Sequence, residues 1–201
     1  PFTTRWNYSG TLTGNGTLNK TGTGVFGTIG SMSMSGQINV QAGRIHNDNV
    51  TGNWTGNTAN VDISPGAVLD LRANDMYVNQ LTGSGEIWNS HNAGGGDVLF
   101  VGVSGGSTPY NGTIRGNATQ VNDNPDAAVL SLTKNGAGTF TITGNNTYSG
   151  PTSITAGKLL VNGTNSGTGT VTGSNSAVFG GTGSVAGAVN MTNTSRLAPG
   201  T

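Results

Sequence analysis

The apolar residues of this chain are spaced by two, and short polar stretches separate one group from the next. Phe140 and Ile142 show the spacing, as do Leu159 and Val161. Side chains alternate between the two faces of a β-strand, so this pattern predicts strands with one buried and one exposed face. The polar stretches contain Asn-Gly, Gly-Asn-Asn and Ala-Gly, which favour tight turns. The chain is therefore expected to be all-β, with many short strands.

The strand-and-turn pattern also recurs as a whole unit. Its clearest copy, LTKNGAGTFTITGNNTYSGPTSITAGKLLV, occupies residues 132–161, and a weaker copy, YSGTLTGNGTLNKTGTGVF, occupies residues 8–26. A repeated unit is typical of a solenoid. An antiparallel sandwich is the alternative, but its hairpins would need longer strands joined by two-residue turns. We therefore predict a parallel β-helix of about eight to ten turns, each of roughly 20–25 residues.

Each coil of such a column buries its apolar row only against the coils on either side. Glycine is expected at the corners, where the backbone needs a positive φ or where a side chain would clash. The residues expected in the core ladder are Leu132, Phe140, Ile142, Ile154, Leu159, Val161, Val171 and Phe179, followed by Val185, Val189 and Leu197.

The repeat is not uniform along this single predicted domain. Residues 8–45 form a degenerate repeat, residues 46–128 are expected to form irregular coils with loops, and residues 129–201 form the regular repeat. Loops are predicted at 94–97, 103–109 and 122–126 from their Gly, Asn and Pro content. Insertions in solenoids map to such loops, where binding function often lies. Any specialised function is therefore expected in the middle region.

Composition excludes several classes of protein. The chain has 201 residues, 36 of them glycine, and its 8 basic residues balance 8 acidic ones. No basic stripe is present for a nucleic-acid backbone, so no nucleic-acid partner is predicted. No apolar run reaches the length of a membrane-spanning helix. Cysteine is absent, which excludes disulfides and thiolate metal sites.

The segment 131–161 resembles the autotransporter-associated β-strand repeat of bacterial surface proteins. The resemblance is carried by the alternation from Leu132 to Ile142, by GNNTYSG at 144–150, and by AGKLLV at 156–161; residues 179–185 and 197–200 also fit. It implies a right-handed parallel β-helix on the bacterial surface or outside the cell. The start at Pro1, without Met, is expected for a mature or trimmed product. The repeat itself implies a scaffold and no particular activity.

Catalytic chemistry has few candidates. Polysaccharide lyases and hydrolases need clustered carboxylates, and Asp62, Asp70 and Asp75 would supply a cluster if adjacent coils brought them together. The alternative, which we favour, is that the acids form turns or face solvent. His46 and His91 lack the spacing of a zinc site. We therefore predict no catalytic residue, no metal and no cofactor.

Aromatic residues in the middle region suggest a possible binding surface. Trp54, Trp88 and Tyr77 would suit stacking against a glycan. The favoured alternative is that they fill wide rungs of the core. The predicted function is a structural or adhesive extracellular protein that contacts a host or matrix surface, and the alternative is a carbohydrate-binding or polysaccharide-degrading β-helix.

The two ends of the predicted column lack evident caps. Phe2 and Trp6 are apolar, and the chain stops at Pro199–Thr201, where the family pattern would continue. An uncapped β-helix exposes unpaired strand edges. We therefore expect either that the chain is part of a longer protein or that its copies stack head-to-tail into fibres.

Overall fold

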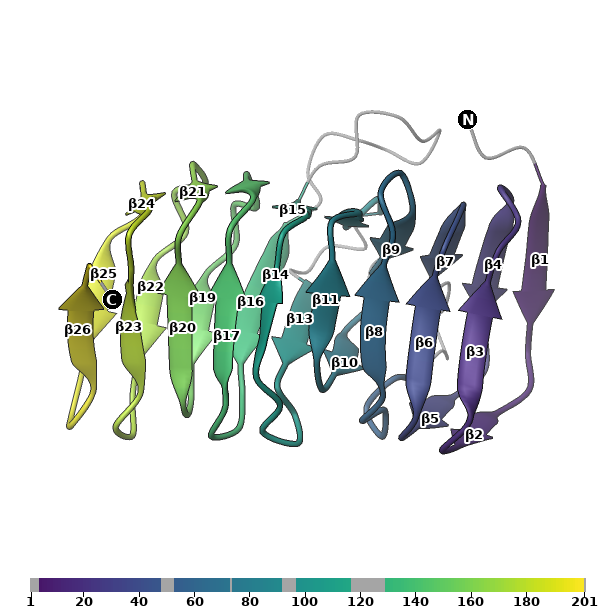
Figure 1. Ribbon diagram of the computed structural model, residues 1–201, viewed down its shortest axis with the longest axis horizontal. Coiled ribbons are helices and arrows are strands. Elements are labelled where there is room, and N and C mark those ends of the chain that lie inside the picture. Colours follow the sequence, from purple (N-terminus) through teal and green to yellow (C-terminus); the bar gives the residue numbers. More distant parts are fainter. Residues whose placement is uncertain (1–3, 48–52, 73, 92–96, 117–128, 201) are drawn as a thin grey trace.

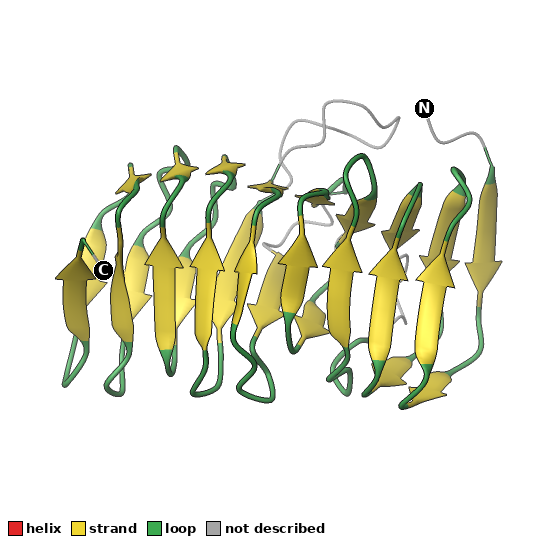
Figure 2. Cartoon of the chain, viewed as in Figure 1, coloured by secondary structure: helices red, strands yellow, loops and turns green. Residues whose placement is uncertain are grey.

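A computed structural model describes residues 4–47, 53–72, 74–91, 97–116 and 129–200, in which the chain winds as a column of strands (Figure 1). The pairings between these strands are parallel and join one coil to the next. From the N-terminus the chain rises at the front, crosses over the top and descends at the back while it advances to the left, so the winding is right-handed (Figure 1). The described residues contain strands and turns only (Figure 2), and no helix capable of crossing a membrane occurs among them.

The first face of the column holds a six-stranded sheet followed by a three-stranded one, so the described part of the chain makes about nine turns. Its strands, in order along the column, are β1 (Arg5–Tyr8), β4 (Val25–Thr28), β7 (Arg44–His46), β9 (Val68–Asp70), β12 (Glu86–Trp88), β15 (Thr113–Arg115), β18 (Asn145–Asn146), β21 (Thr164–Asn165) and β24 (Ser184–Val185).

The second face carries a two-stranded and then a six-stranded sheet, and an isolated bridge between Ser31 and Asn53 marks the coil between them. Its strands are β2 (Leu12–Gly14), β5 (Met32–Met34), β10 (Met76–Val78), β13 (Asp97–Val101), β16 (Leu130–Lys134), β19 (Thr152–Ile154), β22 (Val171–Gly173) and β25 (Val189–Met191).

The third face carries a four-stranded and then a five-stranded sheet. Its strands are β3 (Thr17–Lys20), β6 (Gln37–Val40), β8 (Asn60–Ile63), β11 (Leu81–Gly83), β14 (Thr108–Tyr110), β17 (Thr139–Ile142), β20 (Lys158–Val161), β23 (Val178–Gly181) and β26 (Arg196–Pro199). The three faces together enclose one elongated core, as the predicted solenoid requires.

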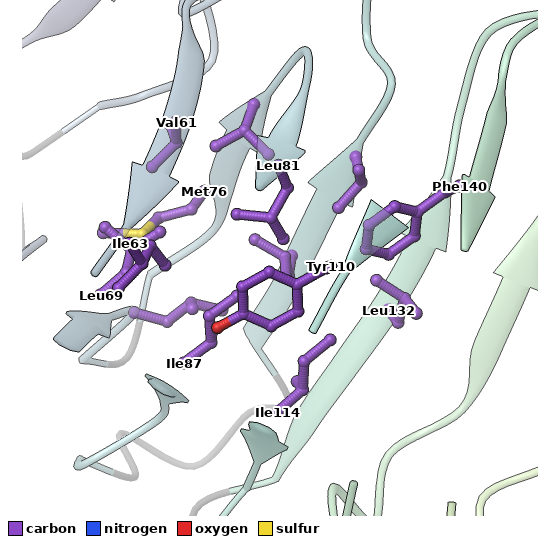
Figure 3. Close-up of a cluster of buried hydrophobic side chains, with 14 of the residues drawn as sticks. Val61, Ile63, Leu69, Met76, Leu81, Ile87, Tyr110, Ile114, Leu132 and Phe140 are labelled. Atoms are coloured by element: carbon purple, nitrogen blue, oxygen red, sulfur yellow. The ribbon is translucent and has the colours of Figure 1, made fainter. Parts of the chain in front are cut away.

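The core consists of ladders of inward side chains, one rung from each coil. Phe26, Ile45 and Leu69 lie opposite one another on the first face, and each is buried. Figure 3 shows rungs from all three faces meeting in the middle of the column: Val61, Ile63, Leu69, Met76, Leu81, Ile87, Tyr110, Ile114, Leu132 and Phe140. Burial of these apolar side chains against neighbouring coils is the main stabilising contribution to such a fold.

The structure buries the residues expected in the ladder from Leu132 to Phe179, none of which exceeds 5% exposure. Leu197 is not buried with them, because its side chain is 56% exposed. Leu197 lies opposite Phe179 in the inward row, but β26 is the last described strand of its face and no described coil covers it. Val185 and Val189 are partly buried for the same reason.

Coil length varies most in the middle of the chain. Paired residues are 19 apart at Phe140 and Leu159, but 27 apart at Ile87 and Ile114. Of the loop predicted at 103–109, residues 103–107 form the turn between β13 and β14, but the prediction was wrong for Thr108 and Pro109, which belong to β14. The loop predicted at 94–97 was wrong for Asp97, which begins β13, and its residues 94–96 lie outside the described residues, as does the loop predicted at 122–126.

Candidate functional site: the central polar corner

A group of polar side chains lies where the central coils pass from the first face towards the second. We call it the central polar corner, and most of its members are buried: Arg44, His46, Asn47, Asp70, Asn74, Asp75, Asn89, Ser90 and Asp97. Buried polar groups require hydrogen-bond partners, and buried charges are costly without counter-charges. The partners of each side chain therefore indicate what this corner can do.

Strand alternation explains how charged residues come to lie side by side here. Ile45 and Leu69 face the core, so their neighbours His46 and Asp70 face outward. The parallel register then places His46 opposite Asp70, and Asp70 opposite Trp88. These outward side chains are nevertheless buried, unlike the polar row of a solvent-facing sheet.

Asp70 is the centre of the corner and is completely buried. Its Oδ2 accepts hydrogen bonds from Arg44 Nη1 at 3.0 Å and from Ser90 Oγ at 2.6 Å. Its Oδ1 accepts from the backbone N–H groups of Ser90 at 3.0 Å and Arg72 at 3.2 Å. Burial raises the pKa of Asp70, while Arg44 and the Ser90 hydrogen bonds lower it. Four donors thus surround this carboxylate, and they tie together three successive coils.

His46 lies beside this ion pair and is fully buried. Burial, and then the positive charge of Arg44, lower the pKa of His46 to about 2, so the imidazole is neutral at physiological pH. Room for the ring comes from Gly27 in the preceding coil, because a Cβ at that position would lie 2.5 Å from His46 Nε2. The glycine is therefore required here by packing.

Asp97 forms the other end of the corner. Its Oδ2 accepts a hydrogen bond from Asn89 Nδ2 at 2.5 Å, and Asn89 Nδ2 also donates to the Val129 carbonyl at 2.9 Å. The backbone N–H of Val98 donates to Asp75 Oδ1 at 2.9 Å. Burial raises the pKa of Asp97 to about 6; Asn89 opposes the rise and the nearby charge of Asp75 adds to it.

The raised pKa of Asp97 predicts a pH-dependent stability. The folded state binds the Asp97 proton more tightly than the unfolded state does. The stability that protonation of Asp97 contributes is therefore fully present below the unfolded pKa of about 3.8 and is lost as pH rises through about 6. Asp97→Asn removes this titration and keeps an oxygen that can accept from Asn89. We expect the variant to melt above the native chain at pH 7.5, with the difference shrinking by pH 5.

Thermal denaturation followed by circular dichroism at both pH values measures this difference. His46 acts in the opposite direction, since its lowered pKa gives stability that is present above about 6.5 and lost as pH falls. That contribution is common to both chains and cancels in the comparison. An unchanged difference in melting temperature between pH 5 and 7.5 would contradict the assignment to Asp97.

The carboxylates of the corner make contacts within and between coils. Asp70, Asp75 and Asp97 each accept hydrogen bonds from neighbouring groups. Asp62 does not join Asp70 and Asp75 in a cluster. It lies on β8 of the third face, where its Oδ1 accepts a hydrogen bond from Thr82 Oγ1 at 2.7 Å. No group of three or more metal-ligating side chains is found among the described residues. The arrangement is that of a cross-link between coils.

Of the possible stacking residues Trp54, Trp88 and Tyr77, the two tryptophans are buried, in line with the favoured alternative. Trp54 is 1% exposed, and its Nε1 donates to Thr28 Oγ1 at 3.0 Å inside the column. Trp88 is 5% exposed, because the Arg115 guanidinium lies 4.8 Å from its ring centroid. These two rings therefore offer no free face to a ligand. Tyr77 alone of the three lies at the surface, half-buried on β10.

Two lysines that the sequence reasoning missed join the turns of adjacent coils. Lys134 is fully buried, and its Nζ donates to the Asn135 and Gly136 carbonyls and, in the next coil, to Ala156 O at 3.5 Å. Burial lowers the pKa of Lys134 to about 8. Lys20 repeats the arrangement with the carbonyl of Gly22 and, at 2.9 Å, that of Ala42.

A sequence signal for these lysines was present in both copies of the repeat. KNGAGTF at 134–140 matches KTGTGVF at 20–26, and Ala-Gly follows 22 residues after each lysine. Gly157 has φ 69° and Gly43 has φ 70°, and a Cβ at either glycine would lie 2.5 Å or less from a carbonyl oxygen of the turn in the preceding coil. The lysine and the glycine thus form one corner unit that the chain uses twice.

Comparison with known proteins agrees with this architecture. Residues 132–161 match the family model of the passenger-associated-transport repeat. Over 153 residues, or 76% of this chain, the sequence is 31% identical to the adhesin BmaC autotransporter of Brucella suis biovar 1 (strain 1330), and the chain spans only 4% of that protein's length. No solved structure matches the chain. The repeat, the parallel solenoid that it forms and the likeness to an autotransporter all fit an autotransporter-passenger β-helix repeat protein.

Proposed function

We propose that this chain is the β-helical scaffold of a bacterial surface adhesin, exported from the cell and exposed to host or matrix surfaces. The observation that carries the proposal is the likeness to an autotransporter adhesin over 76% of the chain, combined with a nine-turn column of parallel strands. A solenoid of this kind holds length and presents an extended surface, because each coil is stabilised by its neighbours.

The proposed role is not enzymatic. In the described part of the chain, the most buried acid, Asp70, is held by an ion pair and three hydrogen bonds from Ser90 and Arg72. General acid–base catalysis needs a carboxyl group that can reach a substrate. The polysaccharide-degrading alternative therefore lacks support, whereas glycan binding without cleavage fits an adhesin.

Adhesion can be tested with the purified chain on latex beads. We expect beads coated with the folded chain to attach to cultured epithelial cells in larger numbers than beads coated with serum albumin. Beads carrying heat-unfolded chain serve as the matched control and should lose the excess. The adhesive role would be refuted if the folded chain bound cells no better than albumin.

We also propose that copies of the chain associate end to end. Trp6 is 64% exposed and Leu197 is 56% exposed, although both belong to inward rows, one in the first coil and one in the last. A cavity of about 550 Å³ beside Trp6 is lined by Leu18 and Phe26. A second copy would cover these surfaces and continue the parallel ladders.

Sedimentation analysis tests this end-to-end association. The mean particle mass should rise with protein concentration for the native chain, and Trp6→Ser should abolish the rise. A native chain that stays strictly monomeric would exclude end-to-end association.

A further inference from the structure

The second face of the column carries an outward row that is mostly hydroxylated. Phe100 lies opposite Thr133, Thr133 opposite Ser153, and Ser153 opposite Thr172. Small, uncharged, polar side chains are therefore enough to cover this outward surface of the sheet. Two aromatic residues interrupt it, Tyr77 on β10 and Phe100 on β13, and they occupy adjacent rungs.

The two aromatic rings form a stacked pair. Their centroids are 4.2 Å apart and their planes differ by 7°. Both side chains are half-buried, so part of each residue reaches solvent. We call these two residues, Tyr77 and Phe100, the aromatic pair.

The rungs on both sides of the aromatic pair carry threonine. Thr133 lies opposite Phe100. In the preceding coil, Asn57 Nδ2 donates to the Tyr77 carbonyl at 2.7 Å and the Ala59 carbonyl accepts from Asn79 N at 2.9 Å, which places Thr58 beside Tyr77. Threonine is shorter than an aromatic side chain, so each ring extends beyond its neighbour. The pair thus offers an apolar ring face on each side, with a hydroxyl group at its base.

The charge around the aromatic pair restricts the partner. Burial, and then the charge of Asp75, raise the pKa of the Tyr77 hydroxyl. The acidic neighbour disfavours an anionic polymer, and the balanced net charge gives no general attraction for phosphates. Pyranose rings combine an apolar C–H face with a rim of hydroxyl groups, and therefore match an aromatic face flanked by threonine and a carboxylate.

We propose that the aromatic pair is a binding platform for neutral hexopyranose residues of a glycan. One sugar ring stacks on the free face of Tyr77 or Phe100, and its hydroxyl groups hydrogen-bond to Thr58, Thr133 or Asp75. The pair lies beside the central polar corner, whose cross-links hold β10 and β13 in place. The inference rests on the proposed adhesive function and names the class of ligand for it.

Saturation-transfer difference NMR and isothermal calorimetry test the proposal with cellohexaose, maltohexaose and mannohexaose as probes. We expect at least one probe to bind at concentrations of about 10 mM or below. Replacing both rings, Tyr77→Ala with Phe100→Ala, should weaken that binding about tenfold, the effect of losing roughly 1.4 kcal/mol of stacking. Phe100→Tyr keeps the ring and should bind as the native chain does.

Leu160→Ala is the matched control, because Leu160 is a half-buried outward residue on β20 of the third face. It should leave binding unchanged, and the melting temperature of every variant shows that the fold is retained. Binding of none of the three probes would overturn the proposal, as would equal binding by the doubly substituted chain.

The bead assay separates this proposal from the proposed adhesive function. Cell attachment by the native chain without binding of any oligosaccharide would reject the glycan platform and leave the adhesive role standing. Oligosaccharide binding that is lost with the rings, in a chain that attaches to no cells, would support the platform and reject the adhesive role.

Discussion

Asp70→Ala is expected to lower the free energy of unfolding by about 3–5 kcal/mol. The substitution leaves the Arg44 guanidinium buried at 4% exposure without the carboxylate that it contacts at 3.0 Å. It also removes the acceptor for the Ser90 hydroxyl and for two backbone N–H groups. Removing the counter-charge of a buried ion pair costs far more than a surface ion pair contributes, so we expect this substitution to destabilise the chain as much as a core substitution does.

Urea denaturation of the native chain and three variants measures this effect. Asp70→Asn keeps some of the hydrogen bonds and loses the charge, so we expect an intermediate loss. The double substitution Arg44→Met with Asp70→Leu removes both charges and should recover much of the stability. If Asp70→Ala changed stability by less than about 1 kcal/mol, the ion pair could not be the cross-link between coils that the structure indicates.

Phe140→Ala is expected to destabilise the chain by about 3–5 kcal/mol. Phe140 is 1% exposed and lies between Thr108 and Leu159 in register on the third face. The cavity left by the ring would open in a coil that is stabilised chiefly by the coils on either side of it, because stabilisation in a solenoid is local. We therefore expect the neighbouring coils to open together while distant coils stay folded.

Hydrogen exchange by mass spectrometry, together with urea denaturation, tests both parts of this prediction. Peptides from β14, β17 and β20 should lose protection first, and peptides from β4 and β6 should keep it. Thr141→Ala is the control, since Thr141 faces outward on the same strand. Uniform loss of protection along the whole chain would contradict the local character of the effect.

Much of the fold could be predicted from the regular repeat. The alternation at Phe140 and Ile142 correctly indicated which side chains are buried, because strand geometry imposes a period of two wherever one face meets the core. Leu197 shows the limit of the same rule. Alternation indicates that a side chain points inward, but only the adjacent coil can cover it, and the pattern within one strand carries no information about that coil.

The candidate site was much less predictable. Nothing in the spacing of Asp70, Asp75 and Asp97 distinguishes them from Asp62, which lies on another face of the column. Coil lengths in this region differ, so the coil and the face on which a residue lies depend on the lengths of all the coils before it. The aromatic residues are equally hard to tell apart from sequence: Trp54 lies inside the column, Trp88 is covered by Arg115, and Tyr77 reaches the surface.

The sequence alone determined the local units of this protein: short strands, glycine turns, and a lysine followed by a tight corner. The tertiary structure decided where each unit is used. The same lysine motif turns the chain from the third face to the first at Lys20 and from the second to the third at Lys134. The physical reason is that the lysine of each corner donates to carbonyl groups of its own turn and of the next coil, and these contacts can form between any two faces. Which faces the corner joins depends instead on the lengths of all the coils that precede it.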